Sequence, residues 1–242
     1  MRLRVVTAVL ATMMLASASV QAAPKKLLVV TVTKGFRHKS IPVAETVLEE
    51  LAAQSKAFRL DFARTDEELA AKMTPKALDG YDGVVFASTT GELPLPDRDA
   101  FLSWLARGKA FVGIHAATDT YHEWRPFIEM IGGEFKTHGP QVTVSMLVED
   151  KSHPATKGLP ASSDVHDEIY EFKSFEKERV KVLLYMDKHP QTKEPGFYPL
   201  AWTRMQGKGR VFYTALGHRD DVLQAPWFRE HLLGGIVWAL SR

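Results

Sequence analysis

The chain has 242 residues, enough for one large domain or two small ones. Its 45 % apolar and 25 % charged residues are typical of a globular protein. The chain has no cysteine, which excludes disulfides, thiolate metal ligands, iron–sulfur clusters and a cysteine nucleophile. The formal net charge is +2.

Residues 1–22 have the pattern of a secretory signal peptide. Arg2 and Arg4 precede an apolar run without charge over 5–18, and a plausible cleavage site ends at Ala22. The run is shorter than the roughly 20 residues that a membrane-spanning helix needs, so we expect cleavage, no stable membrane anchor, and a periplasmic or secreted protein. Loss of the two arginines leaves 29 basic against 29 acidic residues, which removes the argument for a nucleic-acid partner.

Strands and helices alternate in the first half of the remaining chain. A capping pattern at Thr65 and Glu68 begins a short helix. Apolar runs predict strands over 27–33, 58–62, 83–88 and 110–114, and helical spacing predicts helices over 41–54, 97–107 and 121–131. This alternation predicts an α/β fold with a mostly parallel sheet covered by helices on both faces.

The second half is richer in strands. Strand patterns occur over 141–148, 167–172 and 180–185, which predicts a β-rich section around 141–205. Runs at 200–205 and 210–216 flank Gly207-Lys208-Gly209 as in a hairpin, and a final helix is predicted over 226–240. The chain has no repeats or proline-rich linkers, so one domain over 26–240 is expected.

Polar side chains follow four of the predicted buried strands. In open α/β sheets, ligands bind at the carboxyl ends of the strands, so these side chains predict one functional pocket. They are Arg37 and His38 after the first strand, Thr89 and Thr90 after the third, His115 and Asp119 after the fourth, and His218 and Arg219 after 210–216. The two arginines could bind a carboxylate or hydroxyls, or pair with a local acid such as Asp220.

His115 stands in a pattern similar to the nucleophile elbow of hydrolases. Small residues, Gly113 and Ala117, lie two positions before and after it, and such residues permit a strained turn that raises the central side chain. An imidazole at this place predicts general acid–base catalysis or metal ligation, and argues against a covalent acyl intermediate. Alternatively, the small residues only allow close helix packing.

Several motifs, in order along the chain, resemble the ThuA-like family, which is named for trehalose utilisation. They are Gly35-Phe-Arg-His38, Gly113-Ile-His-Ala-Ala-Thr-Asp119, Gly132-Gly-Glu-Phe135 with His138, His153-Pro154, Asp167-Glu168-Ile-Tyr170, Pro199-Leu-Ala-Trp202, and Gly207-Lys-Gly-Arg-Val-Phe-Tyr213 with Gly217-His218. The resemblance implies the flavodoxin-like three-layer α/β/α sandwich of class I glutamine amidotransferases, with His115 at the elbow in place of cysteine and His218 after a late strand. Without cysteine, glutaminase activity is excluded.

The histidines and carboxylates of these motifs suit two kinds of chemistry. One is proton transfer beside a sugar carbonyl or glycosidic bond by His115, His218 and Glu168, with Asp119 orienting a histidine. The other is ligation of a divalent metal, for which His115, His138 and His218 are the candidates. No HExxH-type spacing is present, so the sequence assigns no cofactor.

Aromatic residues are candidates for stacking on a sugar. On a strand, Glu168, Tyr170 and Phe172 would share one face, which favours Glu168 over Asp167 as the functional acid. Trp124 and Trp202 could also stack on sugar rings, although large aromatic side chains lie more often in the core. His138 and the polar residues at the strand ends would contact the remainder of the ligand.

The sequence therefore predicts an exported ThuA-like protein of carbohydrate metabolism. We expect it to act on a glycoside, disaccharide or keto-sugar by hydrolysis, elimination or isomerisation. Two alternatives stay open, a carbohydrate-binding accessory protein without turnover and a metal-dependent hydrolase outside sugar chemistry. The sequence leaves the oligomeric state open.

Overall fold

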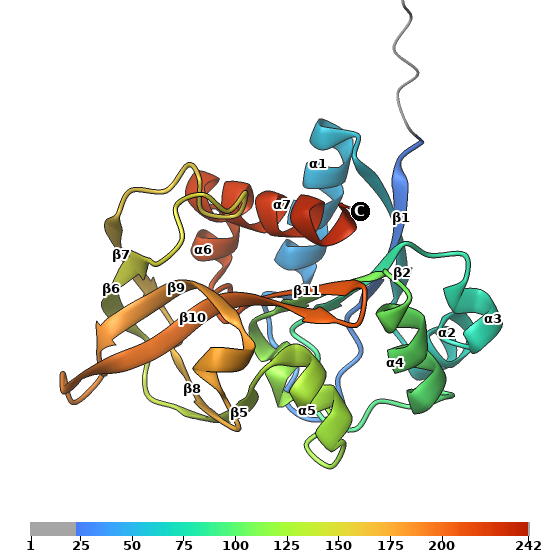
Figure 1. Cartoon of the computed structure of the whole chain (residues 1–242), viewed down its shortest axis with the longest axis horizontal. Coiled ribbons are helices and arrows are strands. Elements are labelled where there is room, and N and C mark those ends of the chain that lie inside the picture. The colour runs from blue at the N-terminus through green and yellow to red at the C-terminus, as the bar shows by residue number, and fades with distance from the viewer. Residues whose placement is uncertain (1–22, 242) are drawn as a thin grey trace, which may run out of the picture.

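A central sheet of nine strands organises the computed structural model, which describes residues 23–241 (Figure 1). The predicted signal peptide lies outside the described residues. The strand order is β2-β1-β3-β4-β11-β10-β9-β6-β7, and a separate two-stranded sheet pairs β5 with β8. The sheet has a parallel half and an antiparallel half that meet at β11 and β10.

The parallel half has the 2-1-3-4-5 strand order of flavodoxin-like folds. Its strands are β1 (Lys25–Val30), β2 (Phe58–Ala63), β3 (Gly83–Ala87), β4 (Ala110–Ile114) and β11 (Gly209–Thr214). Every residue of β3 and β4 is buried, as expected for strands covered on both faces. All five strands end at the same edge of the sheet, which becomes the place for a site.

The antiparallel half confirms the predicted β-rich section. It contains β10 (Pro195–Gln206), β9 (Lys181–Lys188), β6 (Val142–Val148) and β7 (Ser162–Asp167), and beside it lie β5 (Glu134–His138) and β8 (Tyr170–Lys173). The predicted hairpin is present, because β10 and β11 pair antiparallel across the turn at Gly207 and Lys208.

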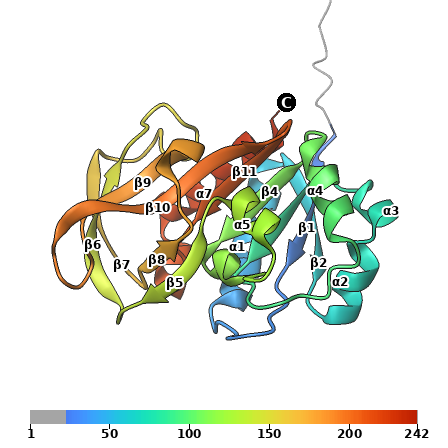
Figure 2. The same cartoon turned by 60° about the horizontal axis from the view of Figure 1, so that its bottom comes forward.

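Helices cover both faces of the parallel half, so the predicted three-layer sandwich is confirmed (Figure 2). One face carries α1 (Ile41–Ser55), α6 (Asp220–Gln224) and α7 (Pro226–Leu240), and the other carries α2 (Asp66–Lys72), α3 (Pro75–Leu78), α4 (Arg98–Ala106) and α5 (Arg125–Ile131). Two 3₁₀ turns, η1 (His115–Asp119) and η2 (Lys177–Arg179), complete the elements. No helix among residues 23–241 is long and apolar enough to cross a membrane.

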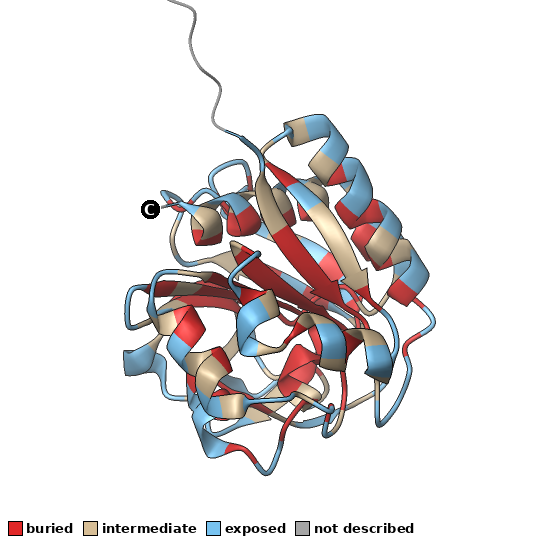
Figure 3. Cartoon of the chain, turned by 90° about the vertical axis from the view of Figure 1, so that its right-hand side faces the viewer, coloured by how far each residue is buried: buried red, intermediate tan, exposed pale blue. Residues whose placement is uncertain are grey.

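The apolar core has one layer on each side of the sheet. Leu27 and Val29 of β1 face the cluster under α1 and α7, whereas Leu28 and Val30 face the cluster under α2, α4 and α5. This alternation follows from the two-residue repeat of a strand. The buried strands run between the helical layers in Figure 3.

Two predicted elements differ from the structure. The helix predicted over 121–131 begins only at Arg125, because Pro126 lies in its first turn and the preceding residues form turns. The strand predicted over 167–172 is divided between β7 and β8, which belong to different sheets. Glu168 lies in the break, so it does not share a strand face with Tyr170, contrary to the prediction.

Candidate functional site

The elbow after β4 raises His115 as its pattern predicts. His115 has a backbone φ of +50°, in the left-handed region that a bulky residue adopts only when its surroundings hold it there. A Cβ at Gly113 would lie 2.9 Å from the Tyr213 ring and 3.2 Å from the Ala117 Cβ, so the small residue is required. The Tyr213 hydroxyl donates to the His115 carbonyl at 2.7 Å, and Thr118 Oγ1 donates in turn to that hydroxyl at 2.9 Å.

The His115 ring has a fixed orientation. Its Nδ1 lies 2.8 Å from the Ala215 carbonyl oxygen, which can only accept, so Nδ1 carries the hydrogen. Its Nε2 therefore points to Glu168 Oε2, 3.4 Å away, and to His218 Nδ1, 3.2 Å away. The ring is completely buried.

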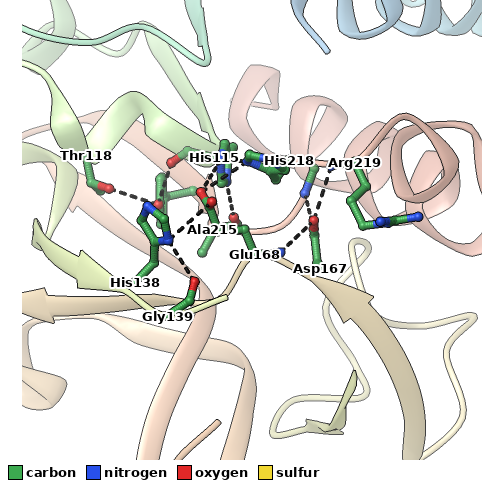
Figure 4. Close-up of polar contacts among 11 residues, drawn as sticks. His115, Thr118, His138, Gly139, Asp167, Glu168, Ala215, His218 and Arg219 are labelled. Carbon is green, nitrogen blue, oxygen red and sulfur yellow. Dashed lines mark hydrogen bonds and ion pairs between the residues drawn. The ribbon is translucent and has the colours of Figure 1, made fainter. Parts of the chain in front are cut away.

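Glu168 lies between three imidazoles (Figure 4). Its Oε2 is 3.1 Å from His218 Nδ1 in addition to its contact with His115, and its Oε1 is 3.3 Å from His138 Nδ1. His38 lies on the other side of the centre, with its ring centroid 4.7 Å from that of His115 and 5.3 Å from that of His218. We call His38, His115, Glu168 and His218 the central cluster.

Asp167 connects the two loops that bring Glu168 and His218 together. Its Oδ2 accepts from the Gly217 backbone N–H at 2.7 Å, and its Oδ1 accepts from the N–H groups of Glu168 and Arg219 at 3.0 and 3.2 Å. Burial raises the pKa of Asp167, and these contacts oppose the rise. Asp167 therefore holds the backbone of both loops, whereas Glu168 faces the imidazoles.

The central cluster is electrostatically polarised. Burial opposes ionisation of Glu168, but hydrogen bonds and charge from His115 and His218 outweigh it and hold its pKa well below its usual range. The hydrogen bond to Glu168 raises the pKa of His218, against the effect of burial. Burial, with the nearby His115 and His218, lowers the pKa of His38 to about 3. At neutral pH the cluster thus holds an anionic Glu168 and a neutral His38, and Glu168 favours the protonated form of His218.

Two further predicted residues border the cluster. The Tyr170 ring packs against the His115 ring with centroids 4.5 Å apart, and it is buried. It therefore supports the imidazole more directly than it could support a sugar. His138 is half-exposed, and its Nδ1 also donates to the Gly139 carbonyl at 2.8 Å.

Three predicted residues, Thr89, Thr90 and Asp119, serve the architecture and lie outside the cluster. Thr89 Oγ1 pairs with Thr120 Oγ1 at 2.8 Å, and Thr90 Oγ1 donates to the Phe36 carbonyl at 3.0 Å, so both buried hydroxyls hold loops. Asp119 does orient a histidine, but this is His122, whose Nε2 is 2.7 Å from Asp119 Oδ1.

The two tryptophans proposed for sugar stacking lie in the apolar core. Trp202 is completely buried and donates from Nε1 to the Ile131 carbonyl at 2.8 Å. Trp124 is 6 % exposed and stacks on Phe127 with centroids 5.6 Å apart. The prediction of surface stacking is corrected for both, because large aromatic rings contribute most when they are buried.

The two candidate arginines are already paired. Arg37 donates from Nη1 to the Thr31 carbonyl at 2.8 Å. Arg219 donates to both carboxylate oxygens of Asp221, at 2.8 and 2.9 Å, and to Gln141 Oε1. Of the two alternatives for Arg219, pairing with a local acid is present, although the acid is Asp221 instead of Asp220.

A pocket of about 450 Å³ opens beside the cluster. Its lining includes His218 and Arg219 from the loop after β11, Phe36 and Lys39 from the loop after β1, and Gln141. Phe36 is 66 % exposed and its ring is 4.9 Å from the His38 ring. The sequence reasoning missed Phe36 and Lys39, although their places beside His38 at a strand end were a usable signal.

This arrangement can move protons at the floor of a pocket. His218 lines the pocket while its Nδ1 is held by Glu168, so Nε2 is the nitrogen left for a ligand. His115 is completely buried and lies behind this pair. A carboxylate, a paired histidine and two further imidazoles can supply a proton, accept one, or together hold a cation.

Comparisons with known proteins agree with the fold and its motifs. The family model described as ThuA, trehalose utilisation, matches residues 26–239. A ThuA-like protein from Parabacteroides merdae is 23 % identical over 90 % of each chain, with a TM-score of 0.75. One from Bacteroides uniformis is 24 % identical over 92 % of this chain and 94 % of the other, with a TM-score of 0.74. No curated protein matches the chain.

A more distant likeness shares the fold alone. A β-galactosidase from Bacillus circulans sp. alkalophilus is 13 % identical over 89 % of this chain and 30 % of its own, with a TM-score of 0.56. The family match, in contrast, spans nearly all of the described residues and includes the elbow, the Glu168 loop and the loop that carries His218. The chain belongs to the ThuA family, which is related to trehalose utilisation and so to carbohydrate metabolism.

Proposed function

We propose that this protein is an exported enzyme that acts on a glycoside, disaccharide or keto-sugar, with His218 as the acid–base group that meets the substrate. The observation that carries the proposal is the Glu168–His218 pair at the pocket. An ionised carboxylate 3.1 Å from Nδ1 orients the imidazole and raises the pKa of His218. His218 follows β11, and ligands of open α/β sheets bind at the carboxyl ends of the parallel strands.

The Glu168–His218 pair supports proton transfer by His218 to an oxygen of the substrate, and from water or a carbon of the substrate. A protonated His218 gives its Nε2 proton to the substrate oxygen that gains an electron pair, either a leaving glycosidic oxygen or a carbonyl oxygen. The neutral ring then takes a proton back from water or from the carbon next to a carbonyl, which restores the starting state. Hydrolysis, elimination and isomerisation each use these two transfers.

The pocket walls support a sugar as the ligand. Phe36 presents an exposed ring at the rim, and aromatic rings pack against the apolar face of a pyranose. Lys39 and Gln141 offer donors and an acceptor to hydroxyls. A volume of about 450 Å³ lies in the usual range for small-molecule sites.

The test is turnover by the mature protein on a panel of disaccharides and their 3-keto forms. We expect His218→Ala to lower kcat/KM about 10²- to 10⁴-fold, the contribution of a general acid–base group. Added imidazole should restore part of the lost activity, because the truncation leaves space that opens to the pocket. His166→Ala is the matched control, since His166 is exposed on β7 and contacts Thr143.

Three outcomes decide between the proposal and its alternatives. Unchanged activity in His218→Ala would contradict the role of His218. Sugar binding in calorimetry without any product would instead favour an accessory carbohydrate-binding protein, the second candidate that the same pocket supports. Loss of sugar affinity in Phe36→Ala would support the rim as the binding surface in either case.

Export is a separate part of the proposal and has its own test. It rests on the sequence of residues 1–22, which lie outside the described residues. Fractionation of cells that express the full chain should find a shortened protein in the periplasm or the medium. A full-length protein in the cytoplasm would contradict export and leave the enzymatic proposal as it is.

A further inference from the structure

The central cluster has the composition of a metal centre without sulfur. His38, His115, Glu168 and His218 each offer one ligand atom, and these atoms all lie within 4.8 Å of one another. Three imidazole nitrogens and one carboxylate oxygen form a donor set that zinc and its neighbours in the periodic table accept. His38 and His115 are buried, as is Glu168, which keeps the centre away from bulk water.

The spacing of three of these atoms fits one ion. The distances are 3.1 Å between His218 Nδ1 and Glu168 Oε2, 3.2 Å between His218 Nδ1 and His115 Nε2, and 3.4 Å between His115 Nε2 and Glu168 Oε2. Adjacent ligand atoms that lie about 2.1 Å from a common ion are about 3.0–3.4 Å apart. The three atoms therefore form one face of a coordination polyhedron.

Groups around the cluster orient it as the outer contacts of a metal site do. His115 donates its Nδ1 hydrogen to the Ala215 carbonyl, which leaves the Nε2 lone pair directed at the centre. Asp167 fixes the backbone on both sides, through Glu168 N–H and Gly217 N–H. His38 Nδ1 is buried and has no hydrogen-bond partner among the described residues.

We propose that His38, His115, Glu168 and His218 bind one divalent transition-metal ion of the zinc type. Binding stands on the geometry above, and only a role of the ion in turnover rests on the proposed function. In the metal-free protein, the proton on His218 Nδ1 lies between Glu168 and His115, and the cation takes the place of this proton. No other group of histidines and acids among residues 23–241 converges in this way.

The first measurement uses tag-free protein that has been treated with a chelator and dialysed. Titration with Zn²⁺ alone in a calorimeter should show one site per chain with a dissociation constant of about 1 μM or lower. Co²⁺ alone should give visible absorption bands whose intensity reports four or five ligands. Absence of stoichiometric binding of both ions would overturn the proposal.

Variants then test the ligand set. His38→Ala and Glu168→Gln should each weaken Zn²⁺ binding at least about 100-fold and change the Co²⁺ spectrum, since each removes a direct ligand. Two controls should keep the wild-type stoichiometry, His138→Ala next to the cluster and His166→Ala on exposed β7. Unaltered binding in both ligand variants would overturn the assignment. Circular dichroism of each variant separates loss of the site from loss of the fold, and His38→Gln replaces His38→Ala if that variant fails to fold.

The two proposals can fail separately. If Zn²⁺ binds but no sugar reacts with or without it, the metal assignment holds and the enzymatic proposal fails. If a sugar is turned over by protein that binds neither ion, the metal assignment fails and acid–base catalysis by His218 remains.

Discussion

Two completely buried histidines, His115 and His231, begin with the same local contact and differ in everything around it. Each places Nδ1 2.8 Å from a backbone carbonyl oxygen, that of Ala215 for His115 and that of Ala155 for His231. The Nε2 of His115 faces Glu168 and His218, whereas that of His231 lies among aromatic rings without a hydrogen-bond partner in the described chain. Burial with one hydrogen bond therefore does not distinguish a site histidine from a structural one. The difference between the two histidines is the Glu168 carboxylate beside His115.

The environment of His231 has an electrostatic consequence of its own. Burial lowers the pKa of His231 to about 4, against the hydrogen bond to Ala155. Burial also lowers the pKa of its neighbour His153 to about 4, against the charge of Asp150. These two imidazoles stay neutral at neutral pH, whereas the hydrogen bond to Glu168 raises the pKa of His218.

The largest expected effect comes from removing the negative charge of Glu168, so that His115, like His231, has no carboxylate beside it. Glu168→Gln removes the anion from among the imidazoles and keeps the shape of the side chain. We expect kcat/KM to fall about 10²- to 10⁴-fold on any sugar that the wild type turns over. Glu171→Gln is the matched control, because Glu171 forms a similar pair with His189, at 3.2 Å, outside the cluster. If Glu168→Gln and Glu171→Gln lower kcat/KM equally, the carboxylate beside His115 has no special role in catalysis.

The second-largest expected effect is on the pH dependence of the unfolding free energy, and it comes from the buried His231 and His153. The unfolded chain protonates these histidines near their ordinary pKa of 6.5, but the folded chain does so only near 4. As pH falls from 6.5 towards 4, protons bind the unfolded state first, so stability is complete above this window and is lost within it. His231 alone should contribute about 3 kcal/mol to this loss.

Urea unfolding at a series of pH values measures this dependence. In His231→Gln, which cannot titrate, the slope between pH 6.5 and 4 should be shallower than in the wild type. A slope that does not change would show that His231 is protonated in the folded protein and that its surroundings are less apolar than described.

The smallest effect comes from the support of the elbow. Tyr213→Phe removes the hydroxyl that donates to the His115 carbonyl at 2.7 Å, and leaves that buried carbonyl without this donor. We expect a loss of about 1–2 kcal/mol in unfolding free energy and about a tenfold lower kcat. KM should not change, because Tyr213 is completely buried and does not line the pocket. A change in KM with constant kcat would contradict a positioning role.

The α/β architecture was predictable because its signals are local. Apolar runs such as 83–88 and 110–114 identify buried strands, and polar residues directly after them identify the edge of the site. The elbow at His115 and the expectation that His115 and His218 lie in one pocket followed from the same reasoning, together with the resemblance to the ThuA-like family.

The details that depended on distant contacts were not predictable. Trp202 and Thr89 differ from the expectation because a residue next to a motif can equally pack into the core, and only the fold decides. Glu168 was identified for a wrong reason, a shared strand face with Tyr170. Its true position depends on Asp167, whose contact with Gly217 joins segments 50 residues apart.

The position of β7 at the outer edge of the antiparallel half links folding to activity. The carboxylate next to it in sequence, Glu168, meets His115 and His218, which follow β4 and β11 of the parallel half. A chain with only the parallel half formed would hold three imidazoles and lack their anion. The cluster is complete only when segments 50 and 103 residues apart in the sequence have met, and closing such loops costs entropy. Under the proposed function, activity is therefore a reporter of completed folding, because chains without the docked Glu168 segment lack the acid–base pair.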